Sequence, residues 1–265
     1  MYIDKKTEKK IPISKDQLNG YYVVTDFDRT ITNGASKTSW SILSESDLVP
    51  KSYAQEMQEL YDYYRPIEID ESLDFTMRSA LVSEWYRKHI DLFVKYKLSE
   101  EVFIKAGSDL RVMQFRDGAK DFLAFLHDNN IPLIIISAGI GNFIECFLQK
   151  NNCYYDNIYI CSNRIIFKDG VAVGVDTNIT HSLNKNEVAL PEEIKKKLVA
   201  KKHVILLGDQ ESDLRMVDSK DHKSVINIGF FSTRTETPYD EYIKYFDIVC
   251  NEEDNYKVLM KKLFR

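Results

Sequence analysis

The sequence contains little cysteine and proline, and it has no hydrophobic run of membrane-spanning length. Its 265 residues include 4 Cys and 6 Pro. The cysteines form no Cys-x-x-Cys pair and no histidine follows them at zinc-finger spacing, so neither a structural zinc site nor a disulfide framework is expected. The most apolar stretch, residues 131–144, is too short to cross a bilayer. The first ten residues contain no run typical of a signal peptide. We therefore expect a soluble, cytoplasmic protein.

The chain also lacks an excess of positive charge. It carries 36 basic and 41 acidic residues, for a formal net charge of −5. A protein that binds nucleic acid without sequence preference needs a basic surface to displace counterions from phosphates, so we expect neither a nucleic-acid nor a membrane partner. No Gly-x-x-x-x-Gly-Lys-Ser/Thr motif is present, which leaves P-loop ATP hydrolysis unsupported. Hydrophobic residues make up 44% of the chain, enough for one large domain or two smaller ones, in a monomer or homodimer.

Two kinds of sequence alternate along the chain. Short apolar runs end in small or acidic residues, which is typical of strands covered by helices on both faces. Between these runs, apolar residues recur at helical spacing. This alternation predicts a doubly wound, Rossmann-like α/β fold. Strands are predicted at residues 21–24, 131–136, 204–207, 225–228 and 247–249, and helices at residues 117–127, 142–148, 187–199 and 257–264.

One long interval breaks this alternation, because it contains helical segments and no strand-like run that ends in glycine. We predict an all-α cap domain inserted into the α/β domain: residues 1–33 and 110–265 form the core, and residues 34–109 form the cap. Beyond the cap, residues 164–173 predict a small β-hairpin closed by Asp-Gly. The cap helices are predicted at residues 53–64, 73–96 and 99–105, the last opened by a capping serine.

Acidic residues follow two of the predicted strands. Asp26 and Asp28 come after the first strand, and Asp209 comes after the strand at residues 204–207. In an open α/β sheet, ligands bind beyond the carboxyl ends of the strands. Carboxylates gathered there repel one another unless a cation joins them, and a cluster of oxygen ligands suits Mg²⁺. Asp-x-Asp alone is a weak signal, because aspartates after strands also serve as turn and helix-cap residues.

Further motifs point to phosphate chemistry. Ser137 and Ala138 follow the most apolar strand where the chain leads into a helix, which predicts a phosphate-binding cradle. Lys185 offers a positive charge to a phosphate oxygen, although a lone lysine is by default a solvated surface residue. Asp213 completes a Gly-Asp-x-x-x-Asp motif, and Thr30 completes Asp-x-Asp-x-Thr. The ordered set of motifs is far more specific than any one of them.

This ordered set resembles the haloacid dehalogenase-like (HAD) phosphatase superfamily. Within that superfamily, the chain is similar to the pyrimidine 5'-nucleotidase family (cytosolic 5'-nucleotidase type III). The resemblance extends over most of residues 23–249. The residues that carry it are Asp26-Phe-Asp28-x-Thr30, Tyr63-Tyr64, Ile67-Glu68-x-Asp70, Glu84-Trp85-Tyr86, Ser137-Ala-Gly-Ile-Gly141, Asn184-Lys185, Leu206-Leu-Gly-Asp209 and Asp213-Leu-Arg-Met216.

The resemblance implies a Mg²⁺-dependent phosphomonoester hydrolase. Asp26 is the expected nucleophile, which forms an aspartyl-phosphate, and Asp28 is the expected general acid and base. Mg²⁺ is expected on Asp26, on the main-chain carbonyl of Asp28 and on Asp209. The expected phosphate ligands are Ser137, the amide of Ala138 and Lys185, and the expected supporting residues are Asp213 and Thr30.

The cap supplies the candidates for substrate specificity. In the family that the chain resembles, the glutamate matching Glu68 contacts the nucleotide and cap aromatics sandwich the base; Trp40, Trp85 and Tyr86 are the candidates here. The alternative is that these aromatics form the core of the cap, and at least one of the adjacent pair Trp85 and Tyr86 is expected there. The cysteine-rich stretch of the animal members is absent, and His89 stands where the family has a serine, so the preferred base stays open.

The leading hypothesis is a 5'-nucleotidase that acts on nucleoside monophosphates, pyrimidine ones by family analogy. The first alternative is a phosphatase of the same superfamily for another small metabolite, such as phosphoserine. Alternatives from other classes are a phosphorylatable signalling module of receiver type and a nucleotide-binding protein without catalysis. The second carboxylate at Asp28 and the long helical insertion disfavour the signalling module, and the intact pair of Asp26 and Asp28 disfavours the binding protein.

Overall fold

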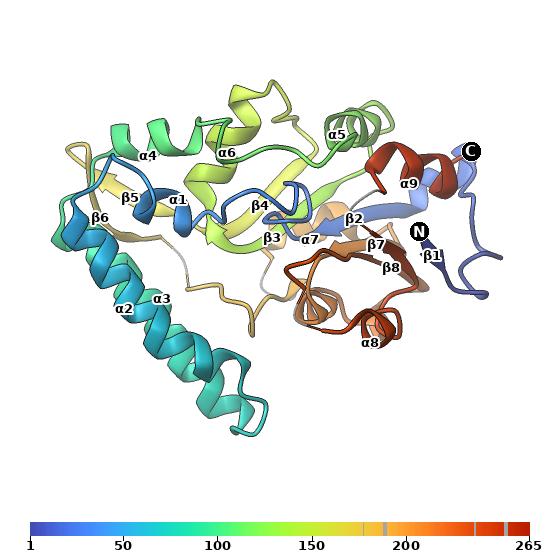
Figure 1. The fold of residues 1–265 in the computed structure, drawn as a ribbon. Helices are drawn as coiled ribbons and strands as arrows, with labels where there is room; N and C mark the ends of the chain where they lie inside the picture. Colours follow the sequence, from blue (N-terminus) through green and yellow to red (C-terminus); the bar gives the residue numbers. More distant parts are fainter. Residues whose placement is uncertain (177, 188–189, 236, 252–253) are drawn as a thin grey trace.

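A seven-stranded sheet forms the centre of the molecule (Figure 1). The structure is a computed structural model that describes residues 1–176, 178–187, 190–235, 237–251 and 254–265. The strand order is β1-β9-β8-β7-β2-β3-β4, and all neighbours are parallel except β1, which is antiparallel to β9. The strands are β1 (Tyr2–Ile3), β2 (Tyr21–Thr25), β3 (Leu133–Ile140), β4 (Ile158–Asn163), β7 (His203–Gly208), β8 (Ser224–Phe230) and β9 (Ile248–Cys250).

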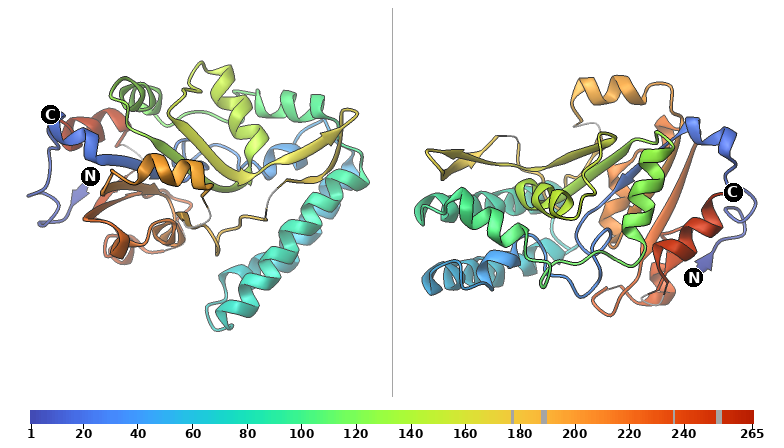
Figure 2. Two further views of the ribbon diagram at one scale, coloured as in Figure 1. Left: turned by 180° about the vertical axis from the view of Figure 1, so that it is seen from behind. Right: turned by 90° about the horizontal axis from the view of Figure 1, so that it is seen from above.

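Helices cover both faces of this sheet, which confirms the predicted doubly wound α/β fold (Figure 2). Alternate residues of each strand point to opposite faces. Val23 and Ile205 therefore belong to one hydrophobic cluster, with α5 (Ala119–Asp128), α6 (Gly141–Lys150) and α9 (Tyr256–Leu263). Val24 and Leu206 belong to a second cluster, with α7 (Glu192–Leu198). On the sheet near β9, α8 (Tyr239–Tyr242) contributes to a smaller cluster.

The interval predicted as a cap is helical. It contains α1 (Ser41–Ser44), α2 (Lys51–Ile69), α3 (Phe75–Lys95) and α4 (Glu100–Gly107). Helices α2 and α3 form an antiparallel pair that projects from the sheet (Figure 1). Asp74 begins α3 by accepting a hydrogen bond from the Met77 amide at 3.0 Å, and Ser99 begins α4 by accepting one from the Val102 amide at 3.3 Å. The serine cap is the one expected from the sequence.

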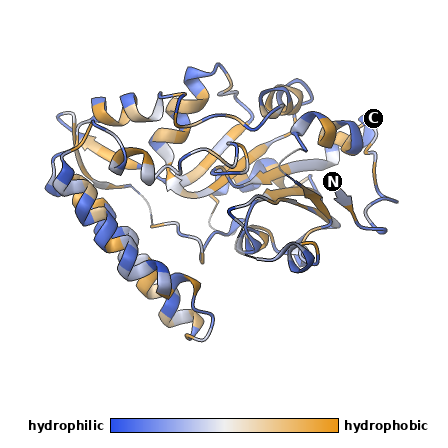
Figure 3. Cartoon of the chain, in the orientation of Figure 1, coloured by the Kyte–Doolittle hydropathy of each residue, from blue (hydrophilic) through white to orange (hydrophobic). Residues whose placement is uncertain are grey.

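Hydrophobic and hydrophilic residues alternate along the α2–α3 pair, whereas much of the central sheet is hydrophobic (Figure 3). Phe103 of α4 joins this pair to the α/β core. Its ring centroid lies 5.3 Å from that of Phe93 on α3, 5.0 Å from that of Phe143 on α6 and 5.1 Å from that of Phe167 in the hairpin. The helical insertion and the sheet therefore share one continuous hydrophobic cluster, and truncation of such a buried ring costs about 3–5 kcal/mol of stability.

The predicted hairpin is present as β5 (Ile165–Lys168) and β6 (Val171–Val175). Its turn residues Asp169 and Gly170 have φ angles of 51° and 75°, the left-handed conformation that Asp-Gly hairpin turns require. The hairpin contacts the insertion through main-chain hydrogen bonds: the Glu100 amide donates to the Gly170 carbonyl and the Ala172 amide donates to the Leu98 carbonyl, both at 2.9 Å. The hairpin thus braces the junction between α3 and α4.

Some boundaries differ from the prediction. Strand β3 extends to Ile140, because its pairing with β4 shifts register between Ile136 and Ile140. Edge strand β4 was not predicted, since its residues are mostly half-exposed and do not form a long apolar run. Helix α7 covers Glu192–Leu198, which is shorter than the predicted helix at 187–199, of which residues 188–189 lie outside the described part. In the described part, no helix is both long and apolar enough to cross a membrane.

Candidate active site

Two carboxylates meet at the carboxyl ends of adjacent strands. Asp26 follows β2 and Asp209 follows β7, and these strands pair in parallel with Thr25 opposite Leu207. The Asp26 amide donates a hydrogen bond to the Leu207 carbonyl at 2.9 Å, which continues the ladder one residue beyond the strand. The side chains of Asp26 and Asp209 are joined by that of Asp213, and one carboxylate oxygen from each of the three lies within 4.8 Å of the others.

The turn after β7 positions Asp213. This residue lies in a short 3₁₀ helix, Glu211–Met216, and its Oδ2 accepts hydrogen bonds from the amides of Asp209 at 3.1 Å and Gln210 at 3.0 Å. A Cβ on Gly208 would lie 2.5 Å from the Asp213 Cβ, so this close approach requires glycine. The glycine of the Gly-Asp-x-x-x-Asp motif therefore makes room for the second aspartate of the same motif.

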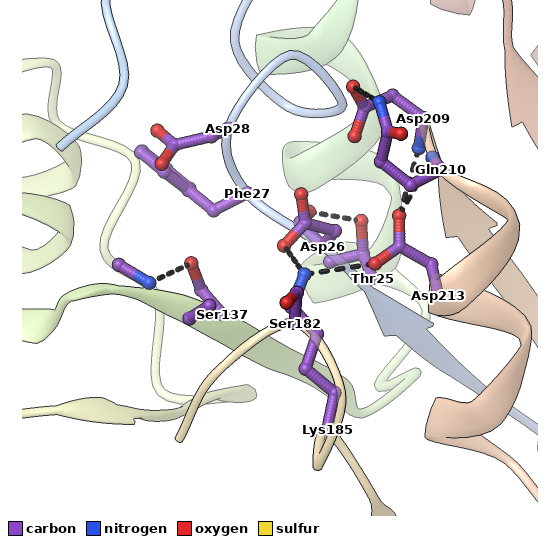
Figure 4. Close-up of polar contacts among 12 residues, drawn as sticks. Thr25, Asp26, Phe27, Asp28, Ser137, Ser182, Lys185, Asp209, Gln210 and Asp213 are labelled. Carbon is purple, nitrogen blue, oxygen red and sulfur yellow. Dashed lines mark hydrogen bonds and ion pairs between the residues drawn. The ribbon is translucent and has the colours of Figure 1, made fainter. Parts of the chain in front are cut away.

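Lys185 bridges two members of this cluster (Figure 4). Its Nζ donates to Asp26 Oδ1 at 2.6 Å and to Asp213 Oδ1 at 2.9 Å, and the lysine side chain is only 8% exposed. Burial acts to lower the pKa of Lys185, but the charges of Asp213 and Asp26 outweigh it and raise the pKa. The lysine is therefore a permanently charged group aimed at the end of β2.

Burial dominates the electrostatics of the carboxylates. It raises the pKa of Asp26 well above the usual range, and it raises the pKa of Asp209 to about 6, with a further contribution from the charge of Asp213. With all three carboxyl groups ionised, the single ammonium group would leave two negative charges in a buried volume, which is why burial favours the protonated acids. A divalent cation would neutralise these charges, and this set of oxygen donors is the kind that Mg²⁺ prefers. The residues present therefore fit the expected metal.

The Asp28 carboxylate lies apart from this cluster and contacts Ser39. Asp28 Oδ2 accepts hydrogen bonds from the amide and from the hydroxyl of Ser39, each at 3.2 Å. Burial raises the pKa of Asp28, and its Oδ1 is buried with no hydrogen-bond partner among the described residues. The expected metal contact of Asp28 involves its main-chain carbonyl, so this arrangement leaves the side chain available for proton transfer.

Ser137 lies inside β3 rather than after it, which corrects the prediction of a cradle at a helix N-terminus; α6 begins only at Gly141. The physical reason is the register shift near the end of β3, which carries the Ser137-Ala-Gly segment past the site as irregular strand. Ser137 Oγ accepts a hydrogen bond from the Gly139 amide at 3.0 Å, and the Ala138 carbonyl accepts one from Trp40 Nε1 at 3.0 Å.

Thr30 does not contact the carboxylates through its hydroxyl. Its Oγ1 is buried and has no hydrogen-bond partner in the described part of the chain. Its carbonyl instead accepts hydrogen bonds from Arg116 Nε and Tyr256 Oη, both at 3.3 Å. Thr30 therefore ties the loop after β2 to Arg116 and to Tyr256 at the start of α9.

The aromatic candidates of the cap divide between two environments. Trp85 packs inside the α2–α3 pair: its ring is stacked on that of Tyr64 with centroids 6.0 Å apart, and its Nε1 donates to His89 Nε2 at 2.8 Å. Tyr86 contacts the loop that carries Lys185, with its ring centroid 5.9 Å from that of His181, and it contacts Trp40, with ring centroids 5.1 Å apart and a T-shaped geometry. Trp85 is therefore a core residue of the cap, whereas Tyr86 and Trp40 form an aromatic pair beside the Ala138 carbonyl.

Glu68 connects the cap to the loop that carries Lys185. It forms an ion pair with Arg65 and accepts a hydrogen bond from the Ser182 hydroxyl. On the next helix, the Ser83 hydroxyl lies 2.9 Å from His181 Nε2.

Five residues of the site region have no role that the sequence patterns predict: Ser39, Ser83, His181, Ser182 and Gln210. The proximity of His181 and Ser182 to Lys185 in the sequence was the one available signal, since serine and histidine alone carry no pattern.

Several known proteins are similar to this chain in sequence. The family model for pyrimidine 5'-nucleotidase (UMPH-1) matches residues 24–264. The 7-methylguanosine phosphate-specific 5'-nucleotidase of Homo sapiens is 31% identical over 245 residues, which is 89% of this chain and 81% of the relative. The protein of the same name from Drosophila melanogaster is 30% identical over 245 residues, 89% of this chain and 76% of the relative.

Solved structures of other proteins share the fold of this chain. A crystal structure of cytosolic 5'-nucleotidase IIIB bound to cytidine superimposes with a TM-score of 0.81 at 27% identity, covering 92% of this chain and 86% of that one. A substrate-bound phosphoserine phosphatase superimposes with a TM-score of 0.58 at 18% identity, covering 91% of this chain and 96% of that one, and shares the HAD fold. The family model spans nearly the whole chain. The chain therefore belongs to the pyrimidine 5'-nucleotidase family, is a phosphoric monoester hydrolase and has the fold of a HAD-family hydrolase.

Proposed function

We propose that this enzyme hydrolyses nucleoside 5'-monophosphates in a Mg²⁺-dependent reaction through an aspartyl-phosphate on Asp26. The observation that carries the proposal is the buried set of Asp26, Asp209, Asp213 and Lys185 at the carboxyl ends of β2 and β7. A phosphate monoester resists nucleophiles because it is anionic, so catalysis needs charge neutralisation and an aligned nucleophile. This set supplies both.

In the first step, a carboxylate oxygen of Asp26 attacks phosphorus and the bond from phosphorus to the ester oxygen breaks. The leaving alkoxide takes a proton from Asp28, which becomes a carboxylate. Ser137, the Ala138 amide and Lys185 hold the phosphoryl oxygens, and Lys185 is already oriented by Asp213 at 2.9 Å. The products of this step are a free nucleoside and phosphorylated Asp26.

In the second step, water attacks phosphorus of the aspartyl-phosphate while Asp28 takes a proton from that water. The bond from phosphorus to the Asp26 oxygen breaks, which regenerates the Asp26 carboxylate, returns the proton to Asp28 and releases inorganic phosphate. Mg²⁺, held by Asp26, Asp209 and the Asp28 carbonyl, would neutralise charge on the phosphoryl group when bound. Each residue thus returns to its starting state.

We propose that residues 34–109 act as the specificity cap over the core of residues 1–33 and 110–265. The aromatic pair of Trp40 and Tyr86 and the carboxylate of Glu68 lie on the side of the cap that contacts the Lys185 loop. A base held between two rings needs their planes about 7 Å apart, twice the contact distance between carbon atoms. The centroids of Trp40 and Tyr86 are 5.1 Å apart, so base binding requires one ring to move.

The proposed substrates are pyrimidine nucleotides, such as CMP and UMP, in line with the matching family and with the cytidine in the similar structure. A second candidate is 7-methylguanosine 5'-monophosphate, for which two of the relatives are named. N7 methylation gives that base a positive charge, and two groups of the cap would favour a cationic ring: the electron-rich indole of Trp40 and the carboxylate of Glu68. Both candidates use the same catalytic residues.

Phosphate release from a substrate panel tests the proposal. UMP, CMP, AMP, GMP, 7-methylguanosine 5'-monophosphate and phosphoserine are compared at equal concentration, with Mg²⁺ and with EDTA. We expect turnover of nucleotides to exceed that of phosphoserine and to stop in EDTA. Equal rates on phosphoserine would instead support a phosphatase for small metabolites, and a phosphorylated Asp26 that persists for minutes would support a signalling module.

We also propose that the enzyme works in the cytoplasm. The supporting observations are the similarity to a cytosolic 5'-nucleotidase and the four cysteines, all free thiols in the structure. Cysteines in reducing compartments are kept as thiols. Subcellular fractionation with antibodies against the chain tests this proposal, and recovery in a membrane or secreted fraction would contradict it.

A further inference from the structure

The strongest unassigned feature near the site is the hydroxyl of Ser39. This side chain is fully buried, and it lies in the segment between Asp28 and α1. Its Oγ donates to Asp28 Oδ2 at 3.2 Å and accepts a hydrogen bond from the Ile140 amide at 3.1 Å. Since the hydroxyl has one proton and the Ile140 amide can only donate, the hydroxyl proton points to Asp28.

This geometry distinguishes the two oxygens of Asp28. Oδ2 accepts from both the amide and the hydroxyl of Ser39, whereas Oδ1 has no partner among the described residues. In the carboxylic acid form, the oxygen that accepts two hydrogen bonds is the carbonyl oxygen. The proton-bearing oxygen is then Oδ1, which is the free one. Ser39 thus selects which oxygen of Asp28 can deliver a proton.

Ser39 is itself held from two sides. The Ile140 amide belongs to the irregular end of β3, and a Cβ on Gly139 would lie 2.2 Å from Ser39 Oγ, so the segment approaches β3 as closely as a glycine permits. On the other side, Trp40 packs its ring against Phe93 of α3, with centroids 6.0 Å apart and planes 14° apart. Ser39 and its neighbour Trp40 therefore together connect α3 to the proposed acid.

We propose that Ser39 is a positioning residue that fixes the side chain of Asp28 so that Oδ1 faces the leaving oxygen of the substrate. The inference rests on the proposed function, in which Asp28 protonates the leaving group. An acid that rotates freely loses much of its catalytic contribution, which for a well-placed acid is about 10²–10⁴-fold. Ser39 acts through Asp28 and does not itself touch the reacting atoms.

The test compares leaving groups. Phenyl phosphate and p-nitrophenyl phosphate have similar shapes, but their leaving groups differ in basicity. Phenolate is the stronger base and depends on protonation by an acid, whereas p-nitrophenolate leaves readily as an anion. The value of kcat/KM reports the steps up to release of the alcohol, so hydrolysis of phosphorylated Asp26 does not enter. For Ser39→Ala we expect kcat/KM on phenyl phosphate and on UMP to fall about tenfold or more, and on p-nitrophenyl phosphate to stay within about twofold.

Ser36→Ala is the matched control, because Ser36 is a buried serine of the same segment. It is 3% exposed, and its hydroxyl contacts Asn33 and the Gln114 main chain instead of Asp28. We expect this variant to treat both aryl phosphates alike. If Ser39→Ala does not fold, Ser39→Cys, which keeps the shape of the side chain with a slightly larger and weaker donor, serves in its place and is expected to show the same selective loss.

The outcomes separate the two proposals. Equal losses on phenyl and p-nitrophenyl phosphate, or no loss on either, would overturn the role of Ser39 while the wild type remains an active phosphatase. Absence of turnover of all three esters by the wild type would overturn the proposed function and the inference with it. A loss confined to phenyl phosphate and UMP supports the positioning role, which a purely structural defect would not reproduce.

Discussion

Lys185 Nζ lies 2.6 Å from Asp26 Oδ1, although 159 residues separate the two in the sequence. The same ammonium group lies 2.9 Å from Asp213 Oδ1, so it holds together carboxylates from two different strand ends. The lysine has a structural as well as a chemical consequence, because without it two buried carboxylates would face each other unneutralised.

Replacement of the nucleophile should stop turnover without unfolding the protein. Asp26→Asn keeps the size of the side chain and removes its nucleophilic oxygen, so we expect phosphate release from UMP to fall more than about a thousandfold. Circular dichroism should show that the variant keeps the wild-type fold, because Lys185 still pairs with Asp213. Substantial residual activity in this variant would show that Asp26 is not the nucleophile.

Removal of the bridging cation should destabilise the metal-free protein. In Lys185→Met, Asp26 and Asp213 lose their shared partner, and breaking a buried ion pair typically costs about 3–5 kcal/mol. Urea unfolding in EDTA measures this loss. Lys195→Met is the control, because Lys195 pairs with the exposed Glu192 on the surface. A similar small change in both variants would contradict the assigned role of Lys185.

Mg²⁺ should stabilise the folded protein through Asp209. A ligand that binds only the folded state adds about 2.7 kcal/mol when present at one hundred times its dissociation constant. We therefore expect the melting temperature of the wild type to rise with MgCl₂ and to return in excess EDTA. In Asp209→Asn the rise should be much smaller. An undiminished rise in that variant would place the cation elsewhere.

Acid should weaken the cap through His89. Burial lowers the pKa of His89 to about 3, whereas a histidine in the unfolded chain titrates near 6.5. Between these values the unfolded chain binds a proton that the folded protein excludes, so the free energy of unfolding falls as the pH falls, by at most about 1.4 kcal/mol per pH unit. The stability gained at neutral pH is thus lost from pH 6.5 downward.

His89→Gln tests this pH dependence, since glutamine does not titrate and keeps an acceptor for Trp85 Nε1. Urea unfolding between pH 4 and pH 7 should show a flatter profile in His89→Gln than in the wild type. His127→Gln is the control, because the side chain of His127 is 40% exposed. Parallel profiles for the wild type and His89→Gln would contradict the prediction.

The sequence and the structure agree best where the signal is local. Runs such as Val204–Leu207 predict buried strands because every residue is apolar, and the order of strands and helices then leaves few topologies for a parallel sheet. Strand β4 was not predicted, because it lies at the edge of the sheet, where burial is partial and the apolar pattern is short. Edge strands carry less sequence information for that physical reason.

Some residues of the candidate site could be predicted from local sequence signals, and others could not. Asp26 and Asp209 could be found from the sequence, since each follows a strand and the carboxyl ends of parallel strands share one edge. Trp85 and Tyr86 could not be distinguished, because neighbouring residues on a helix differ by about 100° in direction and only the packing of α2 on α3 decides which is buried inside the pair.

The amino-acid sequence alone therefore determined the α/β alternation, the helical insertion and the aspartates at the strand ends, because these depend on short-range periodicity. The tertiary structure decided the pairing of Lys185 with Asp26, the contact of Ser39 with Asp28 and the hydrogen bond from Ser182 to Glu68 across 114 residues of sequence. Such contacts depend on how the faces of the sheet and the helices pack together in three dimensions, and no spacing within the chain encodes them.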